Sequence, residues 1–201
     1  MKAVLGVVLA GGQATRMGGG DKSMLPLAGR RVIDHVLERL RPQVSDIALN
    51  ANGDPGRFTE FGLPVVADSV SEFPGPLAGV LAGLDWAAEQ GSDYILTVAA
   101  DTPFFPMDLM RGLDQARTLQ ALPIALAATE GPSKRFRHPT FGLWPVLLRD
   151  DLRQALAAGM RKVVLWTDKH GAAEALFPND LYDPFFNINT PEDLAKAEAM
   201  K

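Results

Sequence analysis

The chain has 201 residues, of which 47% are hydrophobic and 22% are charged, values typical of a globular protein and not of a disordered one. This length suits a single domain, residues 1–201, with one sizeable core. The formal net charge of −4 argues against sequence-independent binding of nucleic acid, which needs clustered cations. The absence of cysteine excludes disulfides, thiolate metal sites and a cysteine nucleophile.

The first element in the chain is an apolar run, Ala3–Ala10, which follows Lys2 in the manner of a short leader sequence. We interpret it instead as a buried first strand, because Gly11, Gly12 and a polar loop follow at once. No apolar run approaches the roughly 20 residues that are needed to span a bilayer. We therefore expect no membrane association and a cytoplasmic location.

Short runs of Val, Ile and Leu recur along the chain, and a loop and a helix-like stretch follow them. Their continuous apolar character fits strands that are buried on both faces of a parallel sheet. The predicted strands are Ala3–Leu9, Asp46–Leu49, Pro64–Ala67, Tyr94–Ala99 and Ile124–Ala128. After these we expect a loop at Gly131–Pro139 and an antiparallel strand at Thr140–Trp144.

Amphipathic segments separate the strands and indicate helices. The predicted helices are Val32–Leu40, Leu77–Glu89, Met107–Arg117 and Leu147–Ala157. A last helix is expected after Thr190, where a cap residue, a proline and two acids come together at Thr190–Asp193. The alternation of strands and helices predicts an α/β protein, a three-layer α/β/α sandwich with a mostly parallel sheet.

The strongest local signal is the loop that follows the first strand, Leu9–Lys22, which holds five glycines and two cations. Glycine brings backbone amides close to a ligand, and successive amides form an anion nest. Arg16 can fork onto phosphate oxygens, and Lys22 adds a point charge. We therefore predict a cradle for a triphosphate; a flexible surface loop with two solvated cations is the alternative. Walker A spacing is excluded, because Asp21 stands where that motif has glycine, and the dinucleotide fingerprint is absent.

Polar residues follow three of the predicted strands. Asp101 comes directly after an apolar strand, so we expect it at the carboxyl edge of the sheet, where open α/β sheets bind ligands. Mg²⁺ takes one or two carboxylates and completes its shell with phosphate oxygens and water, which makes Asp101 a candidate metal ligand. An aspartate that caps the turn before Thr102 is the alternative, and the residues alone leave both open. Asn50 and Asp68 could line the same edge, or serve as a turn residue and a helix cap.

The glycine-rich loop resembles the signature of the molybdenum cofactor guanylyltransferases. That pattern runs Leu-Ala-Gly-Gly, three residues, Arg-Met-Gly, two residues and Asp-Lys, and every fixed position matches. The resemblance continues, in order, along nearly the whole chain. Further matching motifs are Asn50–Asn52, Asp68, Gly75–Gly79, Asp101–Pro103, His138-Pro139, Arg161–Val163 and Asn187–Asp193.

This resemblance implies a Rossmann-like nucleotidyltransferase fold. It also implies transfer of GMP from Mg-GTP to the terminal phosphate of molybdenum-molybdopterin, with release of pyrophosphate and formation of molybdopterin guanine dinucleotide. The implied partners are GTP, molybdenum-molybdopterin, other proteins of molybdenum cofactor biosynthesis and the chaperones of acceptor molybdoenzymes.

The resemblance, read together with the loop chemistry, gives a set of expected site residues. The catalytic residues are Arg16, Lys22 and Asp101, and Asp101 binds Mg²⁺. The guanine nucleotide contacts Leu9, Ala10, Gly11, Gly12, Lys22, Asn50, Asp68 and Asp101. The acceptor contacts Arg161, Lys162, Asn187 and Asn189. A plain cap for the last helix is the alternative role for Asn189.

The chain departs from the family pattern in three places. Ala99-Ala100 stands before Asp101 where Pro-Cys is usual, Gly53 stands where Arg often follows Asn52, and Gln120–Lys134 matches little. The alternative functions are a molybdopterin cytidylyltransferase, a sugar-phosphate nucleotidyltransferase, or a non-catalytic module that binds nucleotide or cofactor. The first two tend to carry a second alanine where Gly11 stands.

Overall fold

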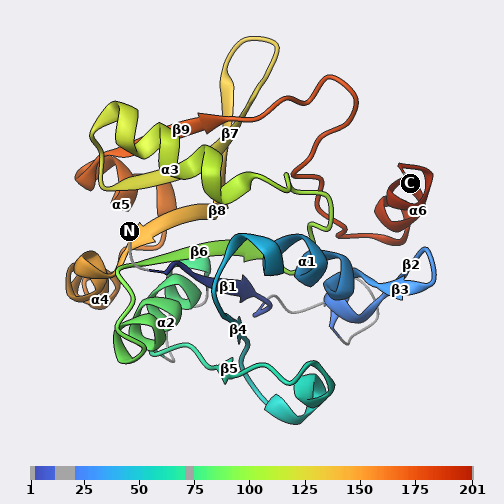
Figure 1. Ribbon diagram of the computed structural model, residues 1–201, viewed down its shortest axis with the longest axis horizontal. Helices are drawn as coiled ribbons and strands as arrows, with labels where there is room; N and C mark the ends of the chain where they lie inside the picture. The colour runs from blue at the N-terminus through green and yellow to red at the C-terminus, as the bar shows by residue number, and fades with distance from the viewer. Residues whose placement is uncertain (1–2, 12–20, 71–74, 201) are drawn as a thin grey trace.

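A computed structural model describes residues 3–11, 21–70 and 75–200. Within these residues seven strands form one sheet, in the order β5-β4-β1-β6-β8-β7-β9 (Figure 1). Strand β8 runs antiparallel to both of its neighbours, and the other strand pairs are parallel. The strands of this sheet are β1 (Leu5–Leu9), β4 (Ile47–Asn50), β5 (Val65–Val66), β6 (Tyr94–Ala99), β7 (Ile124–Glu130), β8 (Arg135–Pro145) and β9 (Ala172–Leu176).

The sheet is buried on both faces, as the continuous apolar runs predict. In β1 the side chains of Val7 and Val8 are both fully buried, yet they belong to two different core clusters because neighbours in a strand point to opposite faces. All five apolar runs are confirmed as strands, with bounds that differ by up to two residues. The expected antiparallel strand is confirmed as part of β8.

Helices cover both faces of the sheet, which confirms the three-layer sandwich. Helices α1 (Val32–Leu40) and α3 (Leu109–Gln120) pack on one face, and α2 (Pro76–Glu89), α4 (Arg149–Ala157) and α5 (Val163–His170) pack on the other. Figure 1 shows α4 and α5 at one end of the molecule and α6 (Pro191–Ala199) at the opposite end. In the part of the chain that the structure describes, no helix has both the length and the apolar character needed to cross a membrane.

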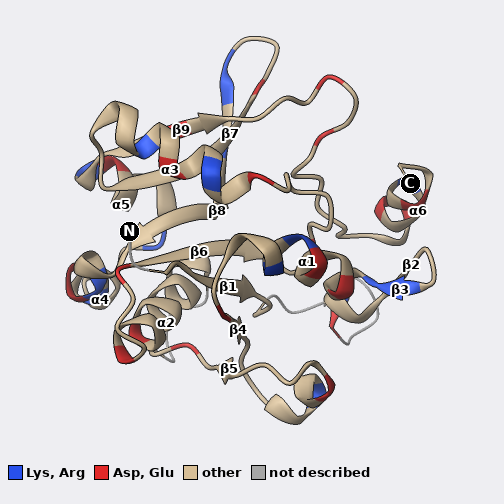
Figure 2. Cartoon of the chain, viewed as in Figure 1, with Lys and Arg blue, Asp and Glu red and all other residues tan. Residues whose placement is uncertain are grey.

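A small separate core lies beneath α6. It is built from Leu27, Val32, Phe104, Ile188 and Ala197, all of them buried. The residue Leu27 belongs to a two-stranded hairpin, β2 (Pro26–Leu27) and β3 (Arg30–Arg31), whose turn has positive φ at both central residues, as such tight turns require. Figure 2 shows the basic residues of β3 beside acidic residues of α1, and Arg31 Nε lies 3.2 Å from Asp34 Oδ2.

The start of α6 is fixed by a capping box. The hydroxyl of Thr190 accepts a hydrogen bond from the amide of Asp193 at 3.2 Å, and the carboxylate of Asp193 accepts one from the amide of Thr190 at 3.0 Å. Pro191 occupies the first helical position, where its missing N–H costs nothing. Thr190, and not Asn189, is therefore the cap residue, which leaves the side chain of Asn189 available for other contacts.

The predicted loop at Gly131–Pro139 is wrong. Strand β7 extends to Glu130 and β8 begins at Arg135, so the two strands form a long hairpin with a turn at residues 131–134. The outer part of this hairpin projects from the sheet (Figure 1). Most of its residues are polar, and Glu130, Arg135 and Phe136 are exposed, so the sequence there lacks the apolar run that marks a buried strand.

Several short elements were not predicted. Besides the β2–β3 hairpin, they are α5, β9 and the 3-10 turns η1 (Lys22–Met24), η2 (Arg41–Gln43), η3 (Pro55–Phe61) and η4 (Val146–Leu148). Within the described ranges, strand β9 pairs with β7 alone, and it is rich in alanine, a residue with low strand propensity. Local propensity therefore gave no signal for it.

We predict that Leu113→Ala lowers the free energy of unfolding by about 2–5 kcal/mol, because it leaves a cavity beneath α3 where the side chain is fully buried. Leu119→Ala on the same helix is the matched control, since Leu119 is 85% exposed; it should change stability by less than about 0.5 kcal/mol. Urea unfolding of both variants measures the difference. Equal losses in the two variants would contradict the packing of α3 described here.

Candidate active site

The carboxyl ends of four parallel strands share one edge of the sheet. In the order β5, β4, β1 and β6, these ends carry Asp68, Asn50, Leu9–Gly11 and Asp101. Backbone hydrogen bonds fix their alignment: the amide of Ala10 donates to the carbonyl of Asn50 at 2.8 Å. After β1 the chain forms β4 and β5 on one side of β1 in the sheet, and it then crosses to form β6 on the other side of β1. The edge between β1 and β6 is therefore a topological switch point, where open α/β sheets bind ligands.

At one end of this edge, two asparagines hold the carboxylate of Asp68. The Asn50 side-chain amide, which is almost fully buried, donates to Asp68 Oδ1 at 2.9 Å. The Asn52 amide donates to Asp68 Oδ2 at 2.8 Å and accepts from the Asp68 backbone amide at 2.9 Å. Each carboxylate oxygen can accept a second hydrogen bond. The carboxylate is thus fixed in direction and can still receive N–H donors from a ligand.

The first turn of α2 approaches these residues closely because of one glycine. A Cβ added at Gly79 would lie 2.3 Å from Asn50 Oδ1 and 2.9 Å from a methyl group of Leu9. Pro76 is the first residue of α2, as predicted, and Gly75 precedes it as the cap. Because helix N-termini favour anions, this close approach adds positive potential to the edge beside β1 and β4.

At the other end of the edge, three segments far apart in sequence meet at Asp101. The ammonium group of Lys22 donates to Asn189 Oδ1 at 2.8 Å, and the amide of Ile188 donates to the carbonyl of Asp101 at 2.9 Å. The hydroxyl of Thr102 lies 3.2 Å from Asp101 Oδ1 and also contacts Asn187 Oδ1. Lys22 and Asp101, predicted from separate motifs, therefore belong to one cluster.

The positive charge of Lys22 only partly offsets the cost of burying the Asp101 carboxylate. Burial raises the pKa of the Asp101 carboxyl group, while the hydrogen bond from Thr102 and the charge of Lys22 act in the opposite direction without overcoming it. A partly buried carboxylate with a raised pKa, next to a lysine, is a typical feature of functional sites. The arrangement favours binding of an additional cation at Asp101.

The two ends of the edge are connected by an arginine. Arg57 forms an ion pair with Asp21 at 3.3 Å and donates to the backbone carbonyl of Asn52 at 2.7 Å. Asp21 directly precedes Lys22, and Asn52 binds Asp68. The segment that carries Lys22 is thus tied to the segment that holds Asp68. Sequence reasoning missed Arg57, because nothing in its surroundings along the chain indicates this contact.

A magnesium ion fits this site only as part of a ligand complex. Among the described residues, no group of three or more His, Cys, Asp or Glu side chains could hold a metal ion. Asp101 provides a single carboxylate beside Lys22. That donor set matches Mg²⁺ bound mainly by phosphate oxygens and water, with one protein carboxylate. Asp101 would hold such an ion, which would supply positive charge to the phosphates.

The remaining predicted site residues are placed less directly. Gly12 and Arg16 lie outside the described residues. Arg161 donates to the carbonyl oxygens of Leu156 and Met160, at the end of α4, and Lys162 is the cap residue of α5. Figure 1 shows both helices at the opposite end of the molecule from α6. The structure therefore does not bring Arg161 and Lys162 next to Lys22 and Asp101, and their acceptor role stays a prediction.

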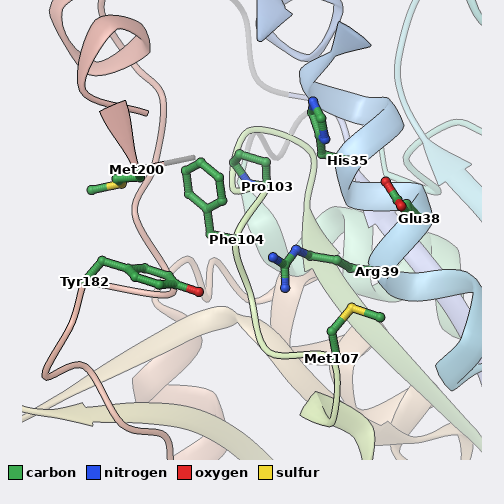
Figure 3. Close-up of a pocket in the computed structure, with 8 residues that line it drawn as sticks. All are labelled: His35, Glu38, Arg39, Pro103, Phe104, Met107, Tyr182 and Met200. Atoms are coloured by element: carbon green, nitrogen blue, oxygen red, sulfur yellow. The ribbon is translucent and has the colours of Figure 1, made fainter. Parts of the chain in front are cut away.

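A cavity of about 230 Å³ lies beside the cluster but is distinct from it. It opens between α1 and the segment that follows Asp101 (Figure 3). It is lined by His35, Glu38, Arg39, Pro103, Phe104, Met107, Tyr182 and Met200. The lining contains none of the predicted site residues. Arg39 donates to the carbonyl of Phe105 at 3.0 Å, so this side chain holds the segment after Asp101 against α1.

The fold and this edge define a nucleotidyltransferase of the α/β class. The model of the MobA-like NTP transferase domain matches residues 6–172, and the chain belongs to that family. A molybdenum cofactor guanylyltransferase of Rhodopseudomonas palustris is 54% identical over 195 residues, which cover 96% of this chain and 91% of the relative. One of Nitrobacter hamburgensis is 50% identical over 198 residues, with 97% and 93% covered.

Solved structures show the same fold. A molybdopterin-guanine dinucleotide biosynthesis protein A from Archaeoglobus fulgidus superimposes with a TM-score of 0.76 at 22% identity, covering 98% of both chains. A 4-diphosphocytidyl-2C-methyl-D-erythritolsynthase from Anaerococcus prevotii gives a TM-score of 0.75 at 15% identity, covering 98% of this chain and 94% of the other. The fold is thus shared by proteins named for different substrates.

We predict that Asp101→Asn stabilises the metal-free, ligand-free protein near neutral pH. A carboxyl group whose folded-state pKa is raised contributes stability below its unfolded pKa and loses it as pH rises through the folded pKa. At neutral pH the ionised form therefore costs stability, which the uncharged amide avoids. Thermal unfolding in a chelator measures the effect. The gain should shrink as pH falls through the raised folded-state pKa and should be lost below about pH 3.9, the ordinary aspartate pKa. A variant less stable than the wild type at neutral pH would contradict it.

Proposed function

We propose that the protein transfers GMP from Mg-GTP to the terminal phosphate of molybdenum-molybdopterin and releases pyrophosphate. The product is molybdopterin guanine dinucleotide. The observation that carries the proposal is the meeting of Lys22 and Asp101 at the carboxyl edge of β1 and β6, beside the Asn50–Asp68 pair. The two relatives that are 54% and 50% identical to this chain are named molybdenum cofactor guanylyltransferases, which supports a guanine nucleotide as donor and the molybdenum cofactor as acceptor.

The guanine nucleotide is proposed to lie along the strand edge. The base contacts Asn50 and Asp68, because the N1–H and N2–H₂ donors of guanine require acceptors and Asp68 is held with lone pairs free. The backbone of Leu9, Ala10, Gly11 and Gly12 follows the ribose and phosphates. Lys22 and Arg16 bind the triphosphate, and Asp101 holds the magnesium ion that accompanies it.

The acceptor is proposed to approach from the side of Asn187 and Asn189, which lie against Thr102 and Lys22. Their amides can donate to phosphate or pterin oxygens. Arg161 and Lys162 are retained as acceptor residues on the resemblance alone. A cytoplasmic location is also part of the proposal.

The chemistry needs no protein nucleophile. An oxygen of the acceptor phosphate attacks the α-phosphorus of GTP, a new P–O bond forms, and the bond to the oxygen that bridges to the β-phosphate breaks. Pyrophosphate leaves with that electron pair. The attacking oxygen is already anionic, so no strong general base is required. Lys22 and Arg16 offset the repulsion between the two anions and stabilise the charge on the leaving group.

We predict that GTP with Mg²⁺ raises the melting temperature, while CTP and ATP do so weakly or not at all. A ligand at 100 times its dissociation constant adds about 2.7 kcal/mol, which corresponds to roughly 5–10 °C for a domain of this size. A thermal shift assay with each nucleotide makes the comparison. Preference for CTP would indicate a cytidylyltransferase. Binding of GTP without transfer to molybdenum-molybdopterin would indicate a non-catalytic module.

We predict that Lys22→Ala lowers the rate of GMP transfer by about 100-fold or more, because it removes a cation that stabilises the transferring phosphates. Its stability should fall by only about 1 kcal/mol, the value of the single hydrogen bond to Asn189. Lys169→Ala is the matched control: this lysine of α5 is largely exposed and pairs with Asp151 at 3.2 Å. Both variants are assayed for transfer and for melting temperature. Wild-type turnover in Lys22→Ala would refute the phosphate role.

A further inference from the structure

Thr102 occupies an unusual position between two of the proposed site residues. Its side chain is completely buried, and its hydroxyl lies 3.2 Å from Asp101 Oδ1 and in contact with Asn187 Oδ1. The Thr102 hydroxyl thus connects the carboxylate that follows β6 with the segment that returns before α6. The sequence indicates no role for Thr102 beyond its place in the matching motif Asp101–Pro103 and after a possible turn.

The chemistry of a hydroxyl sets the direction of these contacts. A hydroxyl group carries one hydrogen, so it can donate fully to only one of two acceptors. The carboxylate of Asp101 is the stronger acceptor because it is ionised. The structure has Asn187 Oδ1 facing this hydroxyl. Because the hydrogen goes to the carboxylate, we infer that the Asn187 amide is turned so that its NH₂ group faces the threonine oxygen. This orientation gives a chain of donors from Asn187 through Thr102 to Asp101.

Such a chain fixes the rotamer of Asp101. The backbone of this residue is already held, because its carbonyl accepts a hydrogen bond from the Ile188 amide at 2.9 Å. Among the described side chains, the Thr102 hydroxyl is the hydrogen-bond partner of Oδ1, and the backbone amide of Asp101 itself also donates to the carboxylate. Loss of the hydroxyl would remove the side-chain restraint on the carboxylate while the backbone contacts remained.

We propose that Thr102 is a positioning residue, which aims the Asp101 carboxylate at the divalent cation of the nucleotide complex and keeps Asn187 beside it. The inference rests on the proposed function to the extent that Asp101 is the metal ligand. Partners that orient a metal-binding carboxylate through a hydrogen bond typically change metal affinity or activity by about 10- to 100-fold when they are removed. Thr102 does not touch the cation.

The test compares Thr102→Val, which keeps the shape and removes the hydroxyl, with Thr102→Ser, which restores it. Thr97→Val is the matched control, because Thr97, in the preceding strand β6, is also completely buried. Its hydroxyl accepts a hydrogen bond from the Trp144 indole at 2.8 Å and contacts none of the described site residues. The first measurement is the Mg²⁺ concentration for half-maximal transfer. The second is the affinity of the protein for Mn²⁺ in the presence of GTP. The electron paramagnetic resonance signal of free Mn²⁺ measures this binding.

Thr102→Val should bind Mn²⁺ about 10- to 100-fold more weakly and need correspondingly more Mg²⁺. Thr102→Ser should stay within about threefold of the wild type, and Thr97→Val should show unchanged metal dependence even if it melts at a lower temperature. If Thr102→Val does not fold, Thr102→Ala against Thr102→Ser makes the same comparison. The proposal would be overturned if the variant without the hydroxyl had the same Mg²⁺ requirement and Mn²⁺ affinity as Thr97→Val.

The Mn²⁺ measurement separates this inference from the proposed function. If the wild type binds Mn²⁺ with CTP and not with GTP, the guanine assignment fails, and the same variants still test Thr102 with the nucleotide that binds. If no nucleotide promotes Mn²⁺ binding in the wild type, Asp101 is not a metal ligand and the role of Thr102 fails with it.

Discussion

The site depends on one backbone contact at the end of β6, where the amide of Ile188 donates to the carbonyl of Asp101. The side chain of Ile188 is buried in the small core beneath α6, so the contact is held by packing as well as by the hydrogen bond. This closure brings Asn187 to Thr102 and Asn189 to Lys22. The polar groups are consequently gathered before any ligand binds, which lowers the entropic cost of organising them around one.

The arrangement carries a cost in stability that function explains. Burial raises the pKa of Asp101, and the single nearby charge of Lys22 does not compensate for it. A protein selected only for stability would replace such a carboxylate, since stability and activity commonly conflict at functional sites. In the proposed function, a nucleotide that arrives with a divalent cation would supply the missing positive charge at Asp101, and its phosphates would take the place of Asn189 as partners for Lys22. The proposal thus makes the folded protein complementary to a metal–triphosphate complex.

Much of the fold could be predicted, because β1, β4 and β6 are buried on both faces and α1 has a clear apolar stripe. Parallel pairing then places Asn50, Asp68 and Asp101 on one edge. The prediction of a loop for the outer part of the β7–β8 hairpin was wrong, because the residues there show no alternation of apolar and polar side chains. No pattern along the chain indicates where residues 187–189 return, so Asn187 and Asn189 were expected at the site from the family resemblance alone. The contact of Asn189 with Lys22 was not predicted. The role of Thr102 depends on burial and distance, which sequence does not encode locally.

The fate of each phosphate of GTP tests the central claim most directly. The protein is incubated with Mg²⁺, molybdenum-molybdopterin and GTP that carries radioactive phosphorus in either the α or the γ position. A nucleotidyltransferase site at Lys22 and Asp101 predicts that the α label enters a pterin dinucleotide and that the γ label is released in pyrophosphate. Recovery of the α label in GDP, with the γ label on the pterin or in free phosphate, would contradict it.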